Sequence, residues 1–149
     1  MGLTMMSLTI KLSDHGFART CYGHLAGELG VAVTEALIDD GMLRIASETT
    51  YEVTAHGEAW LHSLGVVLVD LKPSLRVVGR RCFDGTERRH HLGGPLAVRL
   101  LERMVSLGWL ERMQTDRALI LTQAGAQALA GSLGIRTLPT SLQLNPSTI

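Results

Sequence analysis

The sequence predicts an α+β fold in which one unit, made of a long helix, a β-hairpin and a short helix, occurs twice around a shared core. Residues 24–43 and 91–110 are identical at eight of twenty positions at a constant offset of 67 residues, where chance would give about one identity. The match resumes one inserted residue later, where residues 54–57 correspond to 122–125. The local patterns within both copies predict the same order of elements.

The first unit is expected to cover residues 17–65. Apolar residues at steps of three and four predict a helix over about 17–38. Two short β-prone runs, at 42–45 and 51–53, predict a hairpin. Thr54 then precedes another helical pattern and is a good N-cap for it, because its hydroxyl can accept from a free backbone N–H.

The second unit is expected to cover residues 91–134. The helical period is strongest over 92–107, and strands are predicted near 109–113 and 118–121 before a final helix capped by Thr122. A lone hairpin with one helix cannot bury both of its apolar faces, so the two units should pack together. A helix followed by a small hairpin is also the back half of a winged-helix fold, so the units are tandem winged-helix-like repeats.

Three segments lie outside these units. Residues 1–16 carry little periodic signal and are expected to be irregular. Residues 66–90 are expected to form a basic connector, interrupted by proline and glycine. Residues 135–149 are polar and contain proline, which predicts a disordered tail.

Composition restricts the class of protein. The chain has 149 residues, with 46% hydrophobic and only 4% aromatic residues, so its core must be aliphatic. Fourteen basic and fourteen acidic residues give no net charge, which argues against attraction of the whole surface to nucleic acid or to an anionic membrane. Two cysteines make no disulfide framework, and no secretory signal or membrane span is recognisable. We expect a cytoplasmic protein.

Residues 19–31 (RTCYGHLAGELGV), 80–94 (RRCFDGTERRHHLGG) and 121–125 (LTQAG) resemble the C-terminal half of bacterial ArsR-type winged-helix transcriptional regulators. The family pattern resembles CYDHLAG in the first unit and CLDWSERRPHLAG in the second. The chain departs from it at Gly23, where the pattern has an acidic residue, and at Gly85, where it has Trp. The resemblance covers about residues 17–133. It implies an effector-sensing or dimerisation half without the N-terminal DNA-binding domain.

Cysteine and histidine residues recur at equivalent places in the two units. Cys21 and His24 have the spacing Cys-x2-His, and Cys82, His90 and His91 occupy the corresponding segment of the second unit. If the units pack with twofold symmetry, two thiolates and two imidazoles would suit tetrahedral Zn²⁺, the only cofactor considered. The alternative is that the cysteines are small buried apolar residues and the histidines bond to backbone.

A second cluster is basic. Arginine guanidinium groups bind phosphates and carboxylates in a bidentate manner, so the connector could hold an anionic effector or contact a nucleic acid backbone. The alternative is a solvated, partly ion-paired surface. The arginines concerned are Arg76, Arg80, Arg81, Arg88 and Arg89.

We expect no enzymatic activity. Cys82 with His90 or His91 has the residue types of a thiol nucleophile and its base, but no glycine elbow, phosphate loop or carboxylate pair accompanies them. The leading hypothesis is a dimeric transcriptional regulator of ArsR type, with DNA and a small effector as partners. One alternative is a freestanding sensor of a small ligand or metal without DNA contact. Another is a truncated product that has lost its function.

Overall fold

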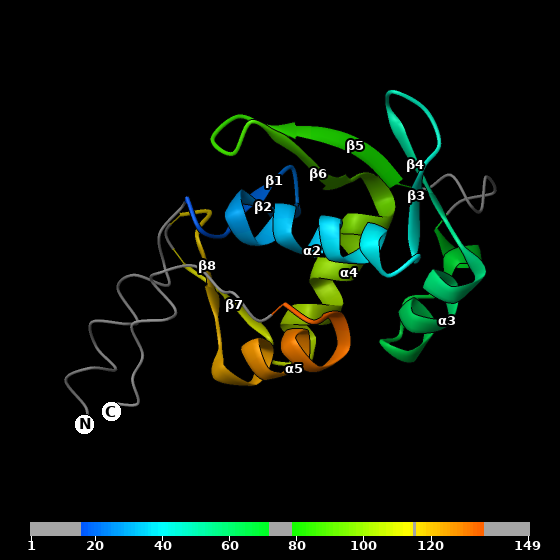
Figure 1. The fold of residues 1–149 in the computed structure, drawn as a ribbon. Helices are drawn as coiled ribbons and strands as arrows, with labels where there is room; N and C mark the ends of the chain where they lie inside the picture. Colours follow the sequence, from blue (N-terminus) through cyan, green and yellow to red (C-terminus); the bar gives the residue numbers. More distant parts are fainter. Residues whose placement is uncertain (1–15, 72–78, 115, 136–149) are drawn as a thin grey trace.

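The structure, a computed structural model, describes residues 16–71, 79–114 and 116–135 (Figure 1). Its fold is α+β, as predicted, and the same order of elements occurs in residues 19–63 and in residues 79–133, here called the first half and the second half. The first half contains β1 (Arg19–Cys21), β2 (His24–Ala26), α2 (Gly27–Asp39), β3 (Leu43–Ile45), β4 (Thr50–Val53) and α3 (Ala55–Ser63). The second half contains β5 (Gly79–Asp84), β6 (Arg89–Gly93), α4 (Gly94–Ser106), β7 (Leu110–Arg112), β8 (Leu119–Leu121) and α5 (Gln123–Leu133). A single 3-10 turn, η1 (Leu68–Asp70), follows the first half.

The two halves are interlocked rather than laid side by side. β4 of the first half pairs with β5 of the second, which creates an antiparallel sheet in the order β3-β4-β5-β6. In the reverse direction, β1 meets the β7-β8 hairpin through a bridge between Arg19 and Ala118, and the Leu119 amide donates to the Ala18 carbonyl at 3.0 Å. The long helices also cross over, because α2 packs on β6 and α4 packs on β2 (Figure 1).

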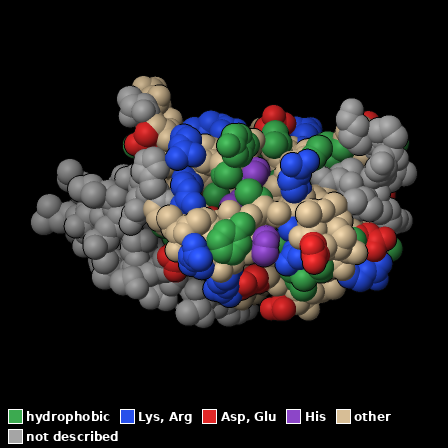
Figure 2. Space-filling model, turned by 90° about the horizontal axis from the view of Figure 1, so that it is seen from above, with side chains coloured by type: hydrophobic (Ala, Val, Ile, Leu, Met, Phe, Trp, Pro, Cys, Tyr) green, Lys and Arg blue, Asp and Glu red, His purple; other side chains and the backbone are tan. Residues whose placement is uncertain are grey.

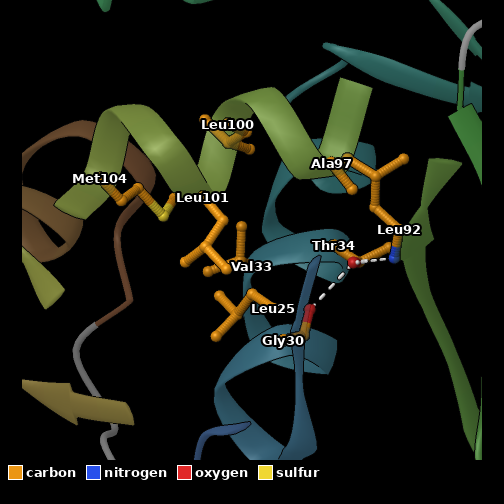
Figure 3. Close-up of a pocket in the computed structure, with 9 residues that line it drawn as sticks. All are labelled: Leu25, Gly30, Val33, Thr34, Leu92, Ala97, Leu100, Leu101 and Met104. Atoms are coloured by element: carbon orange, nitrogen blue, oxygen red, sulfur yellow. Dashed lines mark hydrogen bonds between the residues drawn. The ribbon is translucent and has the colours of Figure 1, made fainter. Parts of the chain in front are cut away.

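The aliphatic core lies between α2 and α4 (Figure 3). One polar side chain, Thr34, is buried there and is fully satisfied: its hydroxyl donates to the Gly30 carbonyl at 2.9 Å and accepts from the Leu92 amide at 2.8 Å. This bond ties the middle of α2 to β6. The apolar cavity beside it has a volume of about 20 Å³, which is close to the space one water molecule needs. It therefore cannot hold an effector.

The first helix is shorter than predicted. A helix is expected over about 17–38, but α2 begins at Gly27 and residues 19–26 form the β1-β2 hairpin. Tyr22 and Gly23 form its turn with φ values of 52° and 88°, which is the backbone of a two-residue hairpin loop. Gly27 also has φ +83°, and a Cβ there would lie 2.9 Å from the Phe17 carbonyl oxygen. Left-handed backbone at the helix start prevents the helix from continuing toward the N-terminus.

The segment expected to be a connector over 66–90 contains regular structure. β5 occupies residues 79–84 and pairs with both β4 and β6. One of its partners, β4, lies far away in the sequence, and the charged residues of β5 hide the period of two that marks a strand. Residues 72–78 of the connector, with Arg76, lie outside the described residues, as do 1–15 and most of the expected tail. Ile135, at the beginning of that tail, is buried against the core.

Locally encoded elements are confirmed. The Thr54 hydroxyl accepts from the Gly57 amide at 3.0 Å, and the Thr122 hydroxyl accepts from the Gly125 amide at 2.9 Å, so both threonines are N-caps. The predicted hairpins correspond to β3-β4 and β7-β8, and α4 lies within the predicted helix. Of the helices that the structure describes, none is both long and apolar enough to cross a membrane.

Candidate metal centre

Each half presents one cysteine and one histidine as a cross-strand pair. In the β1-β2 hairpin Cys21 lies opposite His24, and in the β5-β6 hairpin Cys82 lies opposite His91. Residues directly opposite each other in an antiparallel pair carry their side chains on the same face. Each hairpin therefore directs one sulfur and one imidazole to the same side.

The two pairs converge at the junction of the halves. The four ligand atoms all lie within 4.8 Å of one another. The Sγ atoms of Cys21 and Cys82 are 4.0 Å apart, and the Nε2 atoms of His24 and His91 are 3.0 Å apart. A tetrahedral zinc ion with ordinary bond lengths needs about 3.8 Å between two sulfurs and about 3.3 Å between two nitrogens. The spacing therefore suits a single four-coordinate ion.

The histidines are held in their neutral form, which is the form that binds metal. His24 and His91 are 4% and 1% exposed. Burial, followed by the neighbouring His91, lowers the pKa of His24 to about 4. Burial also lowers the pKa of His91, although Asp84 acts in the opposite direction.

The Cys82 thiol stays protonated at neutral pH unless a cation lies beside it. Burial, followed by the proximity of Cys21, raises the pKa of Cys82 to about 11. A raised pKa is the opposite of what a thiol nucleophile requires at neutral pH. A divalent cation between the sulfurs would stabilise both thiolates, so the site favours metal binding over thiol catalysis.

Asp84 organises the site from behind His91. Its carboxylate is fully buried and lies 3.1 Å from Nδ1 of His91. It accepts from the Gly27 amide at 2.8 Å and from the Arg19 guanidinium at 3.1 Å. Burial opposes ionisation, but these hydrogen bonds and those from the loop after β5 hold the pKa of Asp84 well below its usual range.

The carboxylate decides which nitrogen of His91 faces the cluster. The carboxylate 3.1 Å away favours a proton on Nδ1, although the two groups are not aligned for a hydrogen bond, and this tautomer leaves a lone pair on Nε2 toward His24. Without metal, a proton on His24 Nε2 can be donated to that lone pair across 3.0 Å. With metal, His24 must carry its proton on the other nitrogen. The same geometry therefore serves both an apo and a metal-bound state.

His90 does not belong to the centre. Successive residues of a strand face opposite sides, so His91 faces the cluster while His90 faces away. The His90 ring lies edge-on to Phe83, with its Nδ1 3.4 Å from an Arg81 nitrogen.

The role of Asp84 is not evident from the basic segment in which it occurs. One signal was available, because residues two apart on a strand share a face and Cys82 precedes Asp84 by two.

Three of the four described arginines of the predicted basic cluster, Arg81, Arg88 and Arg89, line one groove, and Arg80 does not. Arg80 and Arg81 are adjacent on β5 and face opposite sides. Arg89 forms an ion pair with Glu35 of α2. Arg88 stacks over Phe83 with its guanidinium carbon 5.3 Å from the ring centre. Of the three arginines in the groove, Arg89 is ion-paired, whereas Arg81 and Arg88 face it without a carboxylate partner among the described residues.

Comparison with known proteins gives one informative relative. The chain is 38% identical over 123 residues to YdfF of Bacillus subtilis (strain 168), described as an uncharacterized HTH-type transcriptional regulator. The match covers 83% of this chain and 54% of that protein, so the chain spans about half the length of the curated relative it matches. No family model matches the chain, and no solved structure matches it.

Proposed function

We propose that this chain is the metal-sensing half of an HTH-type transcriptional regulator of ArsR type, with Zn²⁺ as the effector held by Cys21, His24, Cys82 and His91. The observation that carries the proposal is the convergence of two cross-strand Cys–His pairs, one from each half. The similarity to an HTH-type regulator over most of the chain supports the regulatory part.

The ligand set matches the charge of zinc. Two thiolates and two neutral imidazoles cancel the charge of a divalent cation, so a buried ion would leave no net charge in the interior. Asp84 then compensates Arg19 separately. Since the thiols must lose their protons on binding, zinc affinity should decrease as the pH falls.

Metal binding would act on both long helices. His24 lies three residues before Gly27, the first residue of α2, and His91 lies three residues before Gly94, the first residue of α4. An ion bound to both histidines would therefore hold the two helix starts together. This linkage gives a route from occupancy to the relative position of the halves, and from there to an attached DNA-binding domain and its homodimer partner.

The described helices favour an effector half over a DNA-reading one. α2, the helix before the β3-β4 hairpin, contains neither Lys nor Arg. α4, the helix before β7-β8, has two arginines, of which Arg99 contacts Glu102 and Arg103 donates to the Leu64 carbonyl. A helix that enters the major groove needs side chains that contact bases and phosphates. We propose that operator recognition resides in a separate part of the regulator.

Metal analysis of the untagged chain tests the proposal. We expect one equivalent of zinc, and Co²⁺ substituted for it should show the visible absorption of tetrahedral cobalt with thiolate-to-cobalt charge transfer. Cys21→Ser, Cys82→Ser, His24→Gln and His91→Gln should each lower the affinity by about 10-fold or more. His90→Gln is the matched control because it changes the adjacent residue on the other face, and it should bind normally. A folded wild-type protein that binds neither ion would contradict the proposal.

A DNA-binding assay separates the two main functional readings. In a mobility-shift titration at low salt with DNA from the chain's own promoter, the metal-sensing half alone should give no shift, and the chain joined to a winged-helix domain should give one that responds to zinc. A zinc-binding chain whose joined form ignores zinc would instead favour the freestanding metal-binding module.

A further inference from the structure

The β5-β6 hairpin borders a second site on the face that points away from the metal centre. A groove with a volume of about 380 Å³ lies between this hairpin and α2, and β3 and β4 of the first half complete its wall. Drug-sized ligands occupy pockets of about 300 to 1,000 Å³. Figure 2 shows basic side chains around a hollow on this side of the molecule, with hydrophobic and histidine side chains between them.

Two arginines give the groove uncompensated positive charge. The Arg81 guanidinium is held by neutral acceptors, the carbonyls of Ser47 and Glu48 at 3.4 and 3.2 Å, and its buried Nε has no hydrogen-bond partner. Arg88 is exposed and lies over the Phe83 ring. Within the described part of the chain, neither Arg81 nor Arg88 forms an ion pair with a carboxylate, whereas Arg89 does.

Apolar side chains lie beside these charges. Ile45 and Phe83 line the groove and are 51% and 50% exposed, so both offer apolar surface to a ligand there. Ile38 of α2 continues the same surface. Flat apolar surface next to unpaired guanidinium groups is complementary to a ligand that has an apolar body and one anionic group.

We propose that this groove binds a small organic anion, a carboxylate on a flat apolar body, independently of the metal centre. The carboxylate accepts hydrogen bonds from Arg81 and Arg88, and the body covers Ile45 and Phe83. A nucleic acid backbone fits less well, because Glu35 also lines the groove and would repel a run of phosphates.

Isothermal titration of the zinc-loaded chain with 1-naphthoate tests the proposal, with the neutral 1-naphthamide as the matched ligand. We expect naphthoate to bind at least about 10-fold more tightly than naphthamide, because its carboxylate can form charge-assisted hydrogen bonds. Arg88→Gln and Arg81→Gln should each weaken naphthoate binding by about 10-fold. Arg112→Gln, at an exposed arginine of β7, should leave it within about twofold.

Thermal unfolding and zinc content, measured on each variant, separate this site from the metal centre. Arg88 is exposed, so its variant should fold and hold zinc even if Arg81→Gln does not. Absence of naphthoate binding at millimolar concentration would overturn the proposal. So would equal binding by wild type and Arg88→Gln, or displacement of naphthoate by inorganic phosphate at equal concentration. A wild-type chain that binds naphthoate but no zinc would refute the metal proposal alone.

Discussion

The β1-β2 and β5-β6 hairpins carry the same ligand pair but support it differently. In both, a cysteine faces a histidine across the strands, and the histidine lies three residues before a long helix. The first hairpin closes in a two-residue turn at Tyr22 and Gly23. The second is longer and contains Asp84, whose carboxylate reaches both its own histidine and the Gly27 amide of the other half.

The two hairpins therefore offer the same candidate ligands, but only the second also contains a carboxylate that orients its histidine. The position two residues after the cysteine is Gly23 in the first hairpin and Asp84 in the second. Among the described residues, a carboxylate lies beside the far nitrogen of His91, so in the proposed metal site His24 would be the histidine whose proton moves. In the proposed metal site, Asp84 of the second half would therefore position His91, and the first half supplies no matching carboxylate at Gly23.

The largest effect is expected from removing Asp84, the carboxylate that has no counterpart in the first hairpin. Asp84→Ala leaves the Arg19 charge and the Gly27 amide without their buried acceptor. We expect the free energy of unfolding to fall by about 3 to 5 kcal/mol in urea denaturation. Tyr22→Ala, at the exposed turn of the first hairpin, is the control and should cost less than about 0.5 kcal/mol. Equal effects of the two changes would show that Asp84 gives the second hairpin no special role.

Acid titration of the metal-free protein sharpens the comparison of the histidines. Because the folded pKa of His24 lies at about 4, below its ordinary 6.5, the unfolded chain binds a proton in this range that the folded chain does not. Stability from this residue is therefore present above pH 6.5 and is lost as the pH falls toward 4, by up to about 3 kcal/mol.

Urea unfolding at each pH in the presence of a chelator measures the effect. His24→Gln should flatten the stability profile between pH 6.5 and 4, and the exposed His62→Gln serves as the control for loss of a histidine. A profile of His24→Gln that is as steep as that of the wild type would exclude His24 as the source.

The helix caps provide the smallest test, since here the halves should behave alike. Thr54 and Thr122 accept from the amide three residues later at 3.0 and 2.9 Å, and each also donates to a glycine carbonyl at 2.6 Å. Thr54→Ala and Thr122→Ala should each cost about 1 kcal/mol. The double variant should lose the sum within about 0.5 kcal/mol. A markedly larger loss at one position, measured by thermal unfolding, would show that the halves are not equivalent there.

Elements with local signals were predictable from the sequence. Thr54 and Thr122 mark helix starts through their own side chains, and the three- and four-residue steps in α4 describe its buried face. The β1-β2 hairpin was not predictable in the same way. Its apolar residues, such as Leu25, continue the spacing of α2 into strands of only three residues. Only backbone geometry at Gly23 and Gly27 distinguishes the turn from a helix.

Part of the candidate site could also be predicted from the sequence. Cys21, His24, Cys82 and a histidine at 90 or 91 were all identifiable by residue type. Choosing His91 over His90 required the register of β6 against β5, which pairs Cys82 with His91. Strand register depends on which face becomes buried, and that is a property of the assembled core.

By itself, the sequence determined the α+β class, the β3-β4 and β7-β8 hairpins, the caps that start the short helices, and the residue types available for a metal centre. The tertiary structure alone decided that β4 of the first half pairs with β5 of the second. It also decided that Cys21 lies beside Cys82 and His24 beside His91, which are 61 and 67 residues apart in the chain. The reason is physical: caps and helical periods are interactions within one or two turns, whereas those contacts form only when hydrophobic burial brings distant strands together.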